Sequence, residues 1–179
     1  MGNRGRAGRV RMILADVDGT LTDGSVTPLP EGEELKSYNT KDGLGVMIAQ
    51  LAGLKVGLIT GKSSKALEGR AGRLNIDELY QGVIDKRPAF DEILSRHGLS
   101  ADEVAFIGDD LNDLPLLSAC GLSAAPADAV DAVRRSVHLV CRRRGGEGAF
   151  RELVDFIIGA QKKWDLVRSR FGELFERKI

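Results

Sequence analysis

Three aspartates, at positions 16, 18 and 23, follow an apolar run in the stretch MILADVDGTLTDG (residues 12–24). Neighbouring carboxylates repel one another, so a cation, or a reaction that uses one of them, should offset the repulsion. Two other apolar runs also end in polar residues: VGLI is followed by Thr60 and Gly61, and VAFIG by Asp109 and Asp110. If the fold gathers these three groups, they form a candidate active site.

The types of these residues point to phosphate chemistry. Several carboxylates, with no histidine or cysteine pair of metal-ligand spacing, favour Mg²⁺, which prefers oxygen ligands. A phosphate dianion held by the Thr60 hydroxyl, the Gly61 N–H and Lys86 would balance the remaining charge. Asp16 could then attack phosphorus and form an aspartyl-phosphate. Asp18 could protonate the leaving alkoxide and later deprotonate the attacking water.

Each fragment also has a plain structural interpretation. VDGT is an ordinary turn sequence, and GDD is common in acidic loops. ITGKSS resembles a P-loop, but the first glycine of that motif would fall on Val56, whereas this chain has Gly57. DVDGTLTDG resembles a calcium loop, but Thr20 and Leu21 stand where that loop needs an acid or Asn and a Gly. The functional prediction therefore depends on the three polar strand ends and the lysine together.

The elements that must position these residues alternate along most of the chain. Short branched apolar runs predict strands, and apolar residues at helical spacing predict helices between them. Alternation of this kind predicts an α/β fold with a doubly wound parallel sheet, helices on both faces and ligands at the carboxyl ends of the strands. The expected strands are 10–15, 55–60, 78–82, 103–110, 121–125 and 138–141, and the expected helices 42–53, 63–74, 88–98, a short one after 113, 129–135 and 148–161.

Bulk properties favour a single domain over residues 1–179. We expect a core at about 10–160, a β-hairpin at about 24–39, and a helical tail at 162–179. The basic start of the chain is expected to be a frayed terminus. A formal net charge of zero argues against nucleic acid as a partner, and the longest apolar runs are too short to span a membrane. Two cysteines without metal-ligand spacing, and no signal peptide, favour the cytoplasm.

The motifs together resemble the haloacid dehalogenase superfamily of phosphatases. The resemblance rests on DVDGT after one strand, LITG after a second, a lone lysine, and GDDLND. A finer set (DVDGTLTDG, GEELKSYNTKDGLG, LITGK, LYQGVIDK, FIGDDLND and RGGEGAFRELVDFI) is similar in order and spacing to the 3-deoxy-D-manno-octulosonate 8-phosphate (KDO 8-phosphate) phosphatases. This resemblance implies a Rossmann-like core and Mg²⁺-dependent hydrolysis through an aspartyl-phosphate.

The resemblance also implies a role for each motif residue. Asp16 would be the nucleophile and a Mg²⁺ ligand, and Asp18 the acid/base, with its backbone carbonyl on the metal. Asp109 would be the third ligand from the protein. Thr60 and Lys86 would bind the phosphoryl group.

Two acids of GDDLND would have supporting roles, and the substrate would be enclosed by other subunits. Asp110 and Asp113 would orient Lys86 or metal-bound water. The spacing between motifs leaves no room for a cap domain, so something else must cover the site. The resemblance implies a homotetramer in which the hairpins form a central barrel and a neighbour's C-terminal segment covers the site at a subunit interface.

The residues that would select the substrate are Lys62, Asn39, Asp42, Arg144 and Glu147. Lys62 stands where octulosonate phosphatases usually carry Arg, and Glu147 stands in a loop that usually reads GGRG. The GGEG loop is similar to that of the 2-keto-3-deoxynononate (KDN) 9-phosphate phosphatases, but those relatives would place an acid at position 62. A loop of arginines at 142–144 could reach an acidic substrate across an interface, or could be a solvated basic loop.

The sequence therefore predicts a Mg²⁺-dependent phosphatase for a phosphorylated keto-deoxy sugar acid, with KDO 8-phosphate as substrate. The alternative substrate is KDN 9-phosphate. A phosphatase for a macromolecule is a further alternative, because a site without a cap is open. A non-catalytic oligomerisation module is the alternative from a different functional class, and the intact set of motif residues argues against it.

Overall fold

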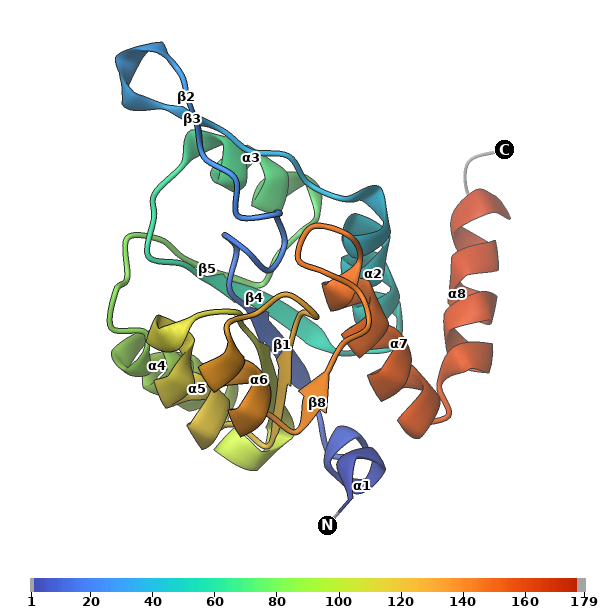
Figure 1. Ribbon diagram of the computed structural model, residues 1–179. Helices are drawn as coiled ribbons and strands as arrows, with labels where there is room; N and C mark the ends of the chain where they lie inside the picture. The colour runs from blue at the N-terminus through green and yellow to red at the C-terminus, as the bar shows by residue number, and fades with distance from the viewer. Residues whose placement is uncertain (1, 177–179) are drawn as a thin grey trace.

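A six-stranded parallel sheet, in the order β5-β4-β1-β6-β7-β8, lies at the centre of the computed structural model, which describes residues 2–176 (Figure 1). This topology confirms the predicted doubly wound α/β fold. Each predicted strand is present, with slightly different ends. The strands are β1 (Met12–Ala15), β4 (Lys55–Ile59), β5 (Glu78–Tyr80), β6 (Val104–Ile107), β7 (Leu122–Ala125) and β8 (Leu139–Val140).

Helices cover both faces of the sheet, because the residues of the central strand alternate between two apolar clusters. Ile13 and Ala15 of β1 pack with α2 and α7 on one face, whereas Met12 and Leu14 pack with α4 and α5 on the other. The helices are α1 (Asn3–Ala7), α2 (Thr40–Leu51), α3 (Lys65–Arg73), α4 (Arg87–His97), α5 (Leu114–Ala119), α6 (Asp131–Ser136), α7 (Ala149–Ala160) and α8 (Trp164–Glu176), with 3-10 turns η1 (Pro30–Gly32), η2 (Ala101–Glu103) and η3 (Leu111–Asp113).

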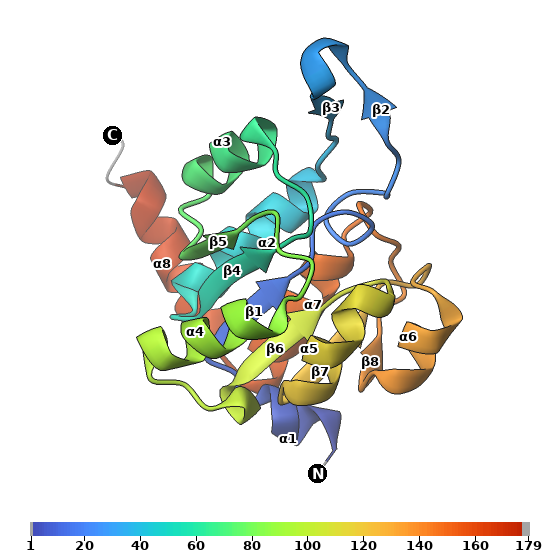
Figure 2. The same ribbon diagram turned by 90° about the vertical axis from the view of Figure 1, so that its left-hand side faces the viewer.

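The predicted hairpin is present as a small antiparallel pair, β2 (Thr27–Pro28) and β3 (Glu34–Leu35). It stands out from the body of the molecule on the side of α3 (Figure 2). No further domain is inserted between the motifs within residues 2–176, as the spacing predicts. None of the helices in the same range combines the length and apolar composition needed to cross a bilayer.

The prediction of a frayed N-terminus is wrong. Residues 3–7 form α1, whose Ala7 is fully buried and packs into the same apolar cluster as α7. Polar side chains hold the segment in place: Arg6 donates to the Gly121 carbonyl at 3.0 Å, and Gln161 donates to the Val10 carbonyl at 2.7 Å. The partners of α1 lie more than 100 residues away in the sequence, so local composition could not reveal them.

Candidate active site

The carboxyl ends of β1, β4 and β6 meet at one edge of the sheet, because these three strands are adjacent and parallel. The backbone N–H of Asp16 donates to the Ile107 carbonyl at 2.9 Å, so the ladder fixes the position of the residue that follows β1. The residues after the strands surround a cleft of about 200 Å³. It is lined by Asp16, Asp18, Thr60, Gly61, Lys62, Asp109, Asp110 and Asn112. Of these, only Asn112 was not predicted, although it lies within the GDDLND motif.

Lys86, which immediately precedes α4, contacts Asp16 at the edge of this cleft. Its side chain is fully buried, and its Nζ contacts the carboxylate of Asp16 directly and lies 2.6 Å from Asp113 Oδ1. Burial alone would lower the pKa of Lys86, but Asp16 and Asp113 outweigh it and raise that pKa. Lys86 is therefore held in its charged form beside the carboxylate predicted to be the nucleophile.

Asp113 links Lys86 to the loop after β6. Its Oδ1 bonds Lys86, and its Oδ2 accepts the backbone N–H of Asp109 at 2.9 Å. The predicted orienting contact with Lys86 is thus present for Asp113. The carboxylate of Asp110 instead accepts the N–H of Leu111 at 2.7 Å and caps η3. Asp113 positions both the buried cation and the loop that carries Asp109.

The carboxylates at this edge have the composition and spacing of a divalent-cation site. Oxygens of Asp16, Asp109 and Asp113 all lie within 4.8 Å of one another. Burial, with repulsion from Asp113, raises the pKa of Asp16 to about 6. Burial, with repulsion from Asp16 and Asp113, raises the pKa of Asp109 to about 7. One lysine does not neutralise these acids, so the residues present fit a hard cation such as Mg²⁺.

A glycine keeps space beside Asp109. Gly19 has a φ of +87°, and a Cβ at this position would lie 2.1 Å from Asp109 Oδ2. Asp109 also accepts a hydrogen bond from the Thr20 hydroxyl at 3.0 Å. Residues 18–20 (DGT) therefore form a turn that packs closely against Asp109. Any larger residue at position 19 would displace the carboxylate of Asp109.

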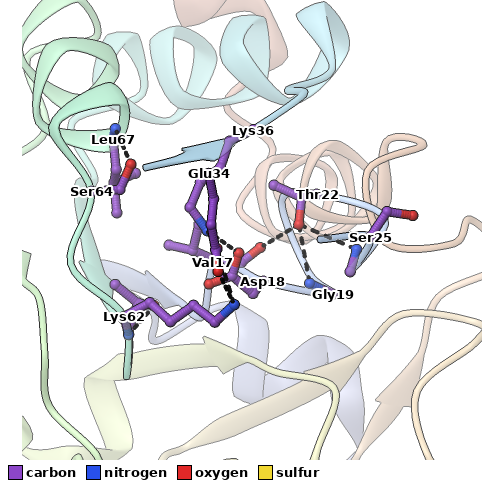
Figure 3. A network of polar contacts seen from close by, with 12 residues as sticks. Val17, Asp18, Gly19, Thr22, Ser25, Glu34, Lys36, Lys62, Ser64 and Leu67 are labelled. Atoms are coloured by element: carbon purple, nitrogen blue, oxygen red, sulfur yellow. Dashed lines mark hydrogen bonds and ion pairs between the residues drawn. The ribbon is translucent and has the colours of Figure 1, made fainter. Parts of the chain in front are cut away.

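The hairpin reaches the mouth of the cleft, which the sequence did not reveal. Lys36 contacts the carboxylate of Asp18 directly, and Lys62 Nζ lies 3.0 Å from Glu34 Oε2 (Figure 3). Glu34 and Lys36 were not predicted as site residues. Glu34 lies in β3 and Lys36 follows it two residues later, and this spacing was the available signal. Only the contacts of Glu34 with Lys62 and of Lys36 with Asp18 place them at the site.

The structure does not bring the other four predicted substrate residues to the cleft. Asn39 caps α2 by accepting the Lys41 N–H at 2.9 Å, and its amide donates to the Gly146 carbonyl. Asp42 is buried and accepts the backbone N–H of Arg151 at 2.9 Å. Arg144 pairs with Asp128 at 3.3 Å, and Glu147 lines a separate groove beside α7. Asn39 and Asp42 thus hold α2 against the loop and helix that follow β8.

Comparison with known proteins agrees with this geometry. The model of the haloacid dehalogenase-like hydrolase family matches residues 70–153. The 3-deoxy-D-manno-octulosonate 8-phosphate phosphatase KdsC of Yersinia pestis is 43% identical over 158 residues, which cover 88% of this chain and 84% of that protein. The KdsC protein of Escherichia coli K12 is 40% identical over 92% of this chain and 88% of its own length.

A solved structure shows the same arrangement of elements. The 3-deoxy-D-manno-octulosonate 8-phosphate phosphatase of Moraxella catarrhalis, solved with a magnesium ion, a phosphate ion and KDO, superimposes with a TM-score of 0.89. It is 32% identical, and the match covers 94% of this chain and 97% of that one. The strand-end cleft, the fold and these relatives agree. The chain belongs to the 3-deoxy-D-manno-octulosonate 8-phosphate phosphatase family of haloacid dehalogenase-like hydrolases.

Proposed function

We propose that this protein is a Mg²⁺-dependent phosphatase that hydrolyses KDO 8-phosphate to KDO and phosphate. The observation that carries the proposal is the convergence of Asp16, buried Lys86 and Asp109 at one edge of the sheet, beside Thr60 and Gly61. Relatives named for this activity share this fold over most of their length. A lysine buried among acids beside an open cleft is typical of a functional site, which argues against a non-catalytic role.

Asp16 acts as the nucleophile in this proposal. One of its carboxylate oxygens attacks phosphorus, the bond from phosphorus to the sugar oxygen breaks, and Asp18 gives that oxygen a proton. Water then attacks the aspartyl-phosphate, Asp18 takes the proton, and the bond from phosphorus to Asp16 breaks to release phosphate. Lys86, the Thr60 hydroxyl and the Gly61 N–H hold the phosphoryl oxygens throughout.

Asp16, Asp109 and the backbone carbonyl of Asp18 would hold the Mg²⁺ ion. When bound, the ion neutralises negative charge on the carboxylates and on the phosphoryl group. The side chain of Asp113 stays with Lys86, since both of its oxygens already accept hydrogen bonds from the protein.

In this proposal, Lys62 contacts the carboxylate of the sugar acid and so contributes to the choice of substrate. Lys62 lines the cleft, and a single ammonium can pair with a substrate carboxylate, although without the two-point contact of an arginine. The deciding experiment is phosphate release with Mg²⁺ from KDO 8-phosphate and KDN 9-phosphate, side by side. We expect preference for the octulosonate ester and loss of both activities in Asp16→Asn. Preference for the nononate ester would make KDN 9-phosphate the substrate instead. If no phosphoester is hydrolysed, the enzymatic function is contradicted.

We further propose that the protein is a homotetramer with the active site at a subunit interface. The hairpin exposes apolar side chains at Val26 (55%), Leu29 (43%) and Leu35 (55%), which is unusual for a projecting element that stays in water. Pairing of hairpins between subunits would bury them. We expect a native mass of four chains, and a monomer at micromolar concentration would contradict the assembly.

The cytoplasm is the compartment that the cysteines favour. Cys120 and Cys141 are both free and buried. Burial raises the pKa of each thiol to about 12, so neither is a reactive thiolate. Two free thiols in one small chain suit a reducing compartment.

Mg²⁺ should stabilise the protein more at pH 8 than at pH 5. In the unfolded chain, Asp16 and Asp109 titrate near 3.8, whereas in the metal-free fold their pKa values are about 6 and about 7. These raised pKa values stabilise the fold fully below pH 3.8. The stabilisation is lost as the pH rises through the pKa values of the folded state. Mg²⁺ binds the ionised groups and opposes this loss.

Thermal unfolding in EDTA and in Mg²⁺, at matched ionic strength, measures the effect. We expect the rise in Tm on adding Mg²⁺ to be larger at the higher pH. An equal rise at both pH values, or none, would show that these carboxylates do not hold the ion.

A further inference from the structure

Four side chains of alternating charge connect the hairpin to the mouth of the cleft; we call them the hairpin network. Lys62 Nζ lies 3.1 Å and 3.0 Å from the two oxygens of Glu34, whose Oε2 lies 3.9 Å from Lys36 Nζ. Lys36 in turn contacts Asp18 Oδ1 directly (Figure 3). The network therefore runs from the candidate substrate residue, Lys62, to the candidate acid/base, Asp18.

Strand alternation explains why two hairpin residues point into the site. Glu34 and Lys36 are two residues apart and lie on the same side of the extended segment, whereas Leu35 between them is 55% exposed on the other side. Shifting the segment by one residue would exchange these faces and remove both charges from the cleft. The register of the hairpin therefore decides whether the network exists.

Lys36 is unusual because its charged side chain is only 5% exposed. Burying a lysine removes its hydration and restricts a long flexible side chain, which is unfavourable unless the ammonium finds partners. Its partners in the structure are Asp18 and, at greater distance, Glu34. The sequence thus places a buried cation on the carboxylate to which the mechanism assigns proton transfer.

Asp18 needs such a partner, since it lies in the turn after β1 rather than within the strand. Its side chain is 30% exposed and would be free to change rotamer if it had no contact. The ammonium of Lys36 fixes Oδ1. Among the described residues, no hydrogen bond or ion pair engages Oδ2, so this oxygen is available to carry the proton.

We propose that Lys36 is a positioning residue that holds the carboxyl group of Asp18 in place for proton transfer, and that Glu34 holds Lys36 and Lys62 in register with it. This inference rests on the proposed function, because Asp18 must act as the acid/base. Lys36 itself makes no bond to the reacting atoms. Replacing Lys36 should therefore slow the reaction of a substrate whose leaving group needs a proton. A substrate whose leaving group needs no proton should react at nearly the same rate.

The test compares two leaving groups in single turnover with enzyme in excess, which isolates the first chemical step. The sugar alkoxide of KDO 8-phosphate needs a proton, whereas the phenolate of p-nitrophenyl phosphate leaves without one. In Lys36→Met we expect KDO formation to slow by about 10²-fold, the low end of a general-acid effect. Release of p-nitrophenol should change by less than about 3-fold, because this leaving group needs no general acid.

Two further variants separate positioning from folding. Lys36→Arg keeps a cation at the same place and should restore KDO formation to within about 10-fold of wild type. Lys65→Met makes the same chemical change at a side chain that is 87% exposed on α3, and should affect neither reaction. A Tm close to that of wild type would show that Lys36→Met is folded.

Parallel losses on both substrates would assign Lys36 a structural role and overturn the proposal, as would wild-type rates on both. Failure of the proposed function is distinguishable, because wild type would then form no KDO at all. In that case the same comparison between wild type and Lys36→Met, made on any alkyl phosphate that wild type hydrolyses, still decides the role of Lys36.

Discussion

Replacing Asp16 by Asn should lower phosphate release by about 10⁴-fold or more, since an amide oxygen cannot form the covalent intermediate. The substitution keeps the shape of a side chain that is only 7% exposed and contacts Lys86. Steady-state phosphate release with KDO 8-phosphate and Mg²⁺ measures the effect. Activity within about 10-fold of wild type would exclude Asp16 as the nucleophile.

The same variant should be at least as stable as wild type when metal is absent. Burial and the charge of Asp113 raise the pKa of Asp16 to about 6, so the ionised form is less favourable in the fold than in the unfolded chain. A neutral amide avoids this penalty, and Lys86 retains Asp113 as a partner. Thermal unfolding in EDTA at pH 8 should therefore give an equal or higher Tm.

Asp23→Asn is the matched control for both measurements. It makes the same chemical change seven residues away, at an exposed side chain that accepts the Ser25 N–H at 2.9 Å. We expect activity within about 2-fold of wild type and a shift in Tm that corresponds to less than ~1 kcal/mol. A large loss of activity in this variant would place Asp23 in the chemistry as well.

Lys86→Met should damage both activity and stability. The ammonium is the buried cation that contacts Asp16 and Asp113, and in the proposed mechanism it also binds the phosphoryl group. Loss of one such electrostatic contact should lower kcat/KM by about 10³-fold. Two buried carboxylates would also lose their partner, which destabilises a fold by ~3–5 kcal/mol, or about 6–20 °C in Tm for a chain of this size.

The pH dependence of stability in Lys86→Met identifies the cause of its destabilisation. Without Lys86 the carboxylates are harder to ionise, so the loss of stability should be greater at pH 8 than at pH 5. Adding Asp16→Asn should recover part of the loss, because one fewer carboxylate then lacks a partner. Lys65→Met, at an exposed side chain, is the control for the removal of a lysine. A loss independent of pH and of Asp16 would indicate a packing defect instead.

The strands, most helices and the polar residues at the strand ends were predictable from the sequence alone. Periodicity of two and of 3.6 reveals which residues must be buried, and parallel strands must bring their carboxyl ends to one edge. The sequence alone therefore predicts that Asp16, Thr60 and Asp109 lie together, and all three line the cleft. Lys86 was predicted from the sequence as a phosphate-binding residue, and its direct contacts with Asp16 and Asp113 are seen only in the structure.

Which polar residues face the cleft depends on contacts between distant segments and was seen only in the fold. Asn39 and Asp42 have types suited to binding a sugar, but the same types cap helices and anchor loops, and here they hold α2 against the segment after β8. Lys36 follows the second strand of the hairpin, and its contact with Asp18 joins residues that lie 18 positions apart in the sequence. α1 likewise owes its order to distant partners. Local pattern fixes which side chains are buried or polar, whereas contacts between segments far apart depend on packing geometry that no local pattern contains.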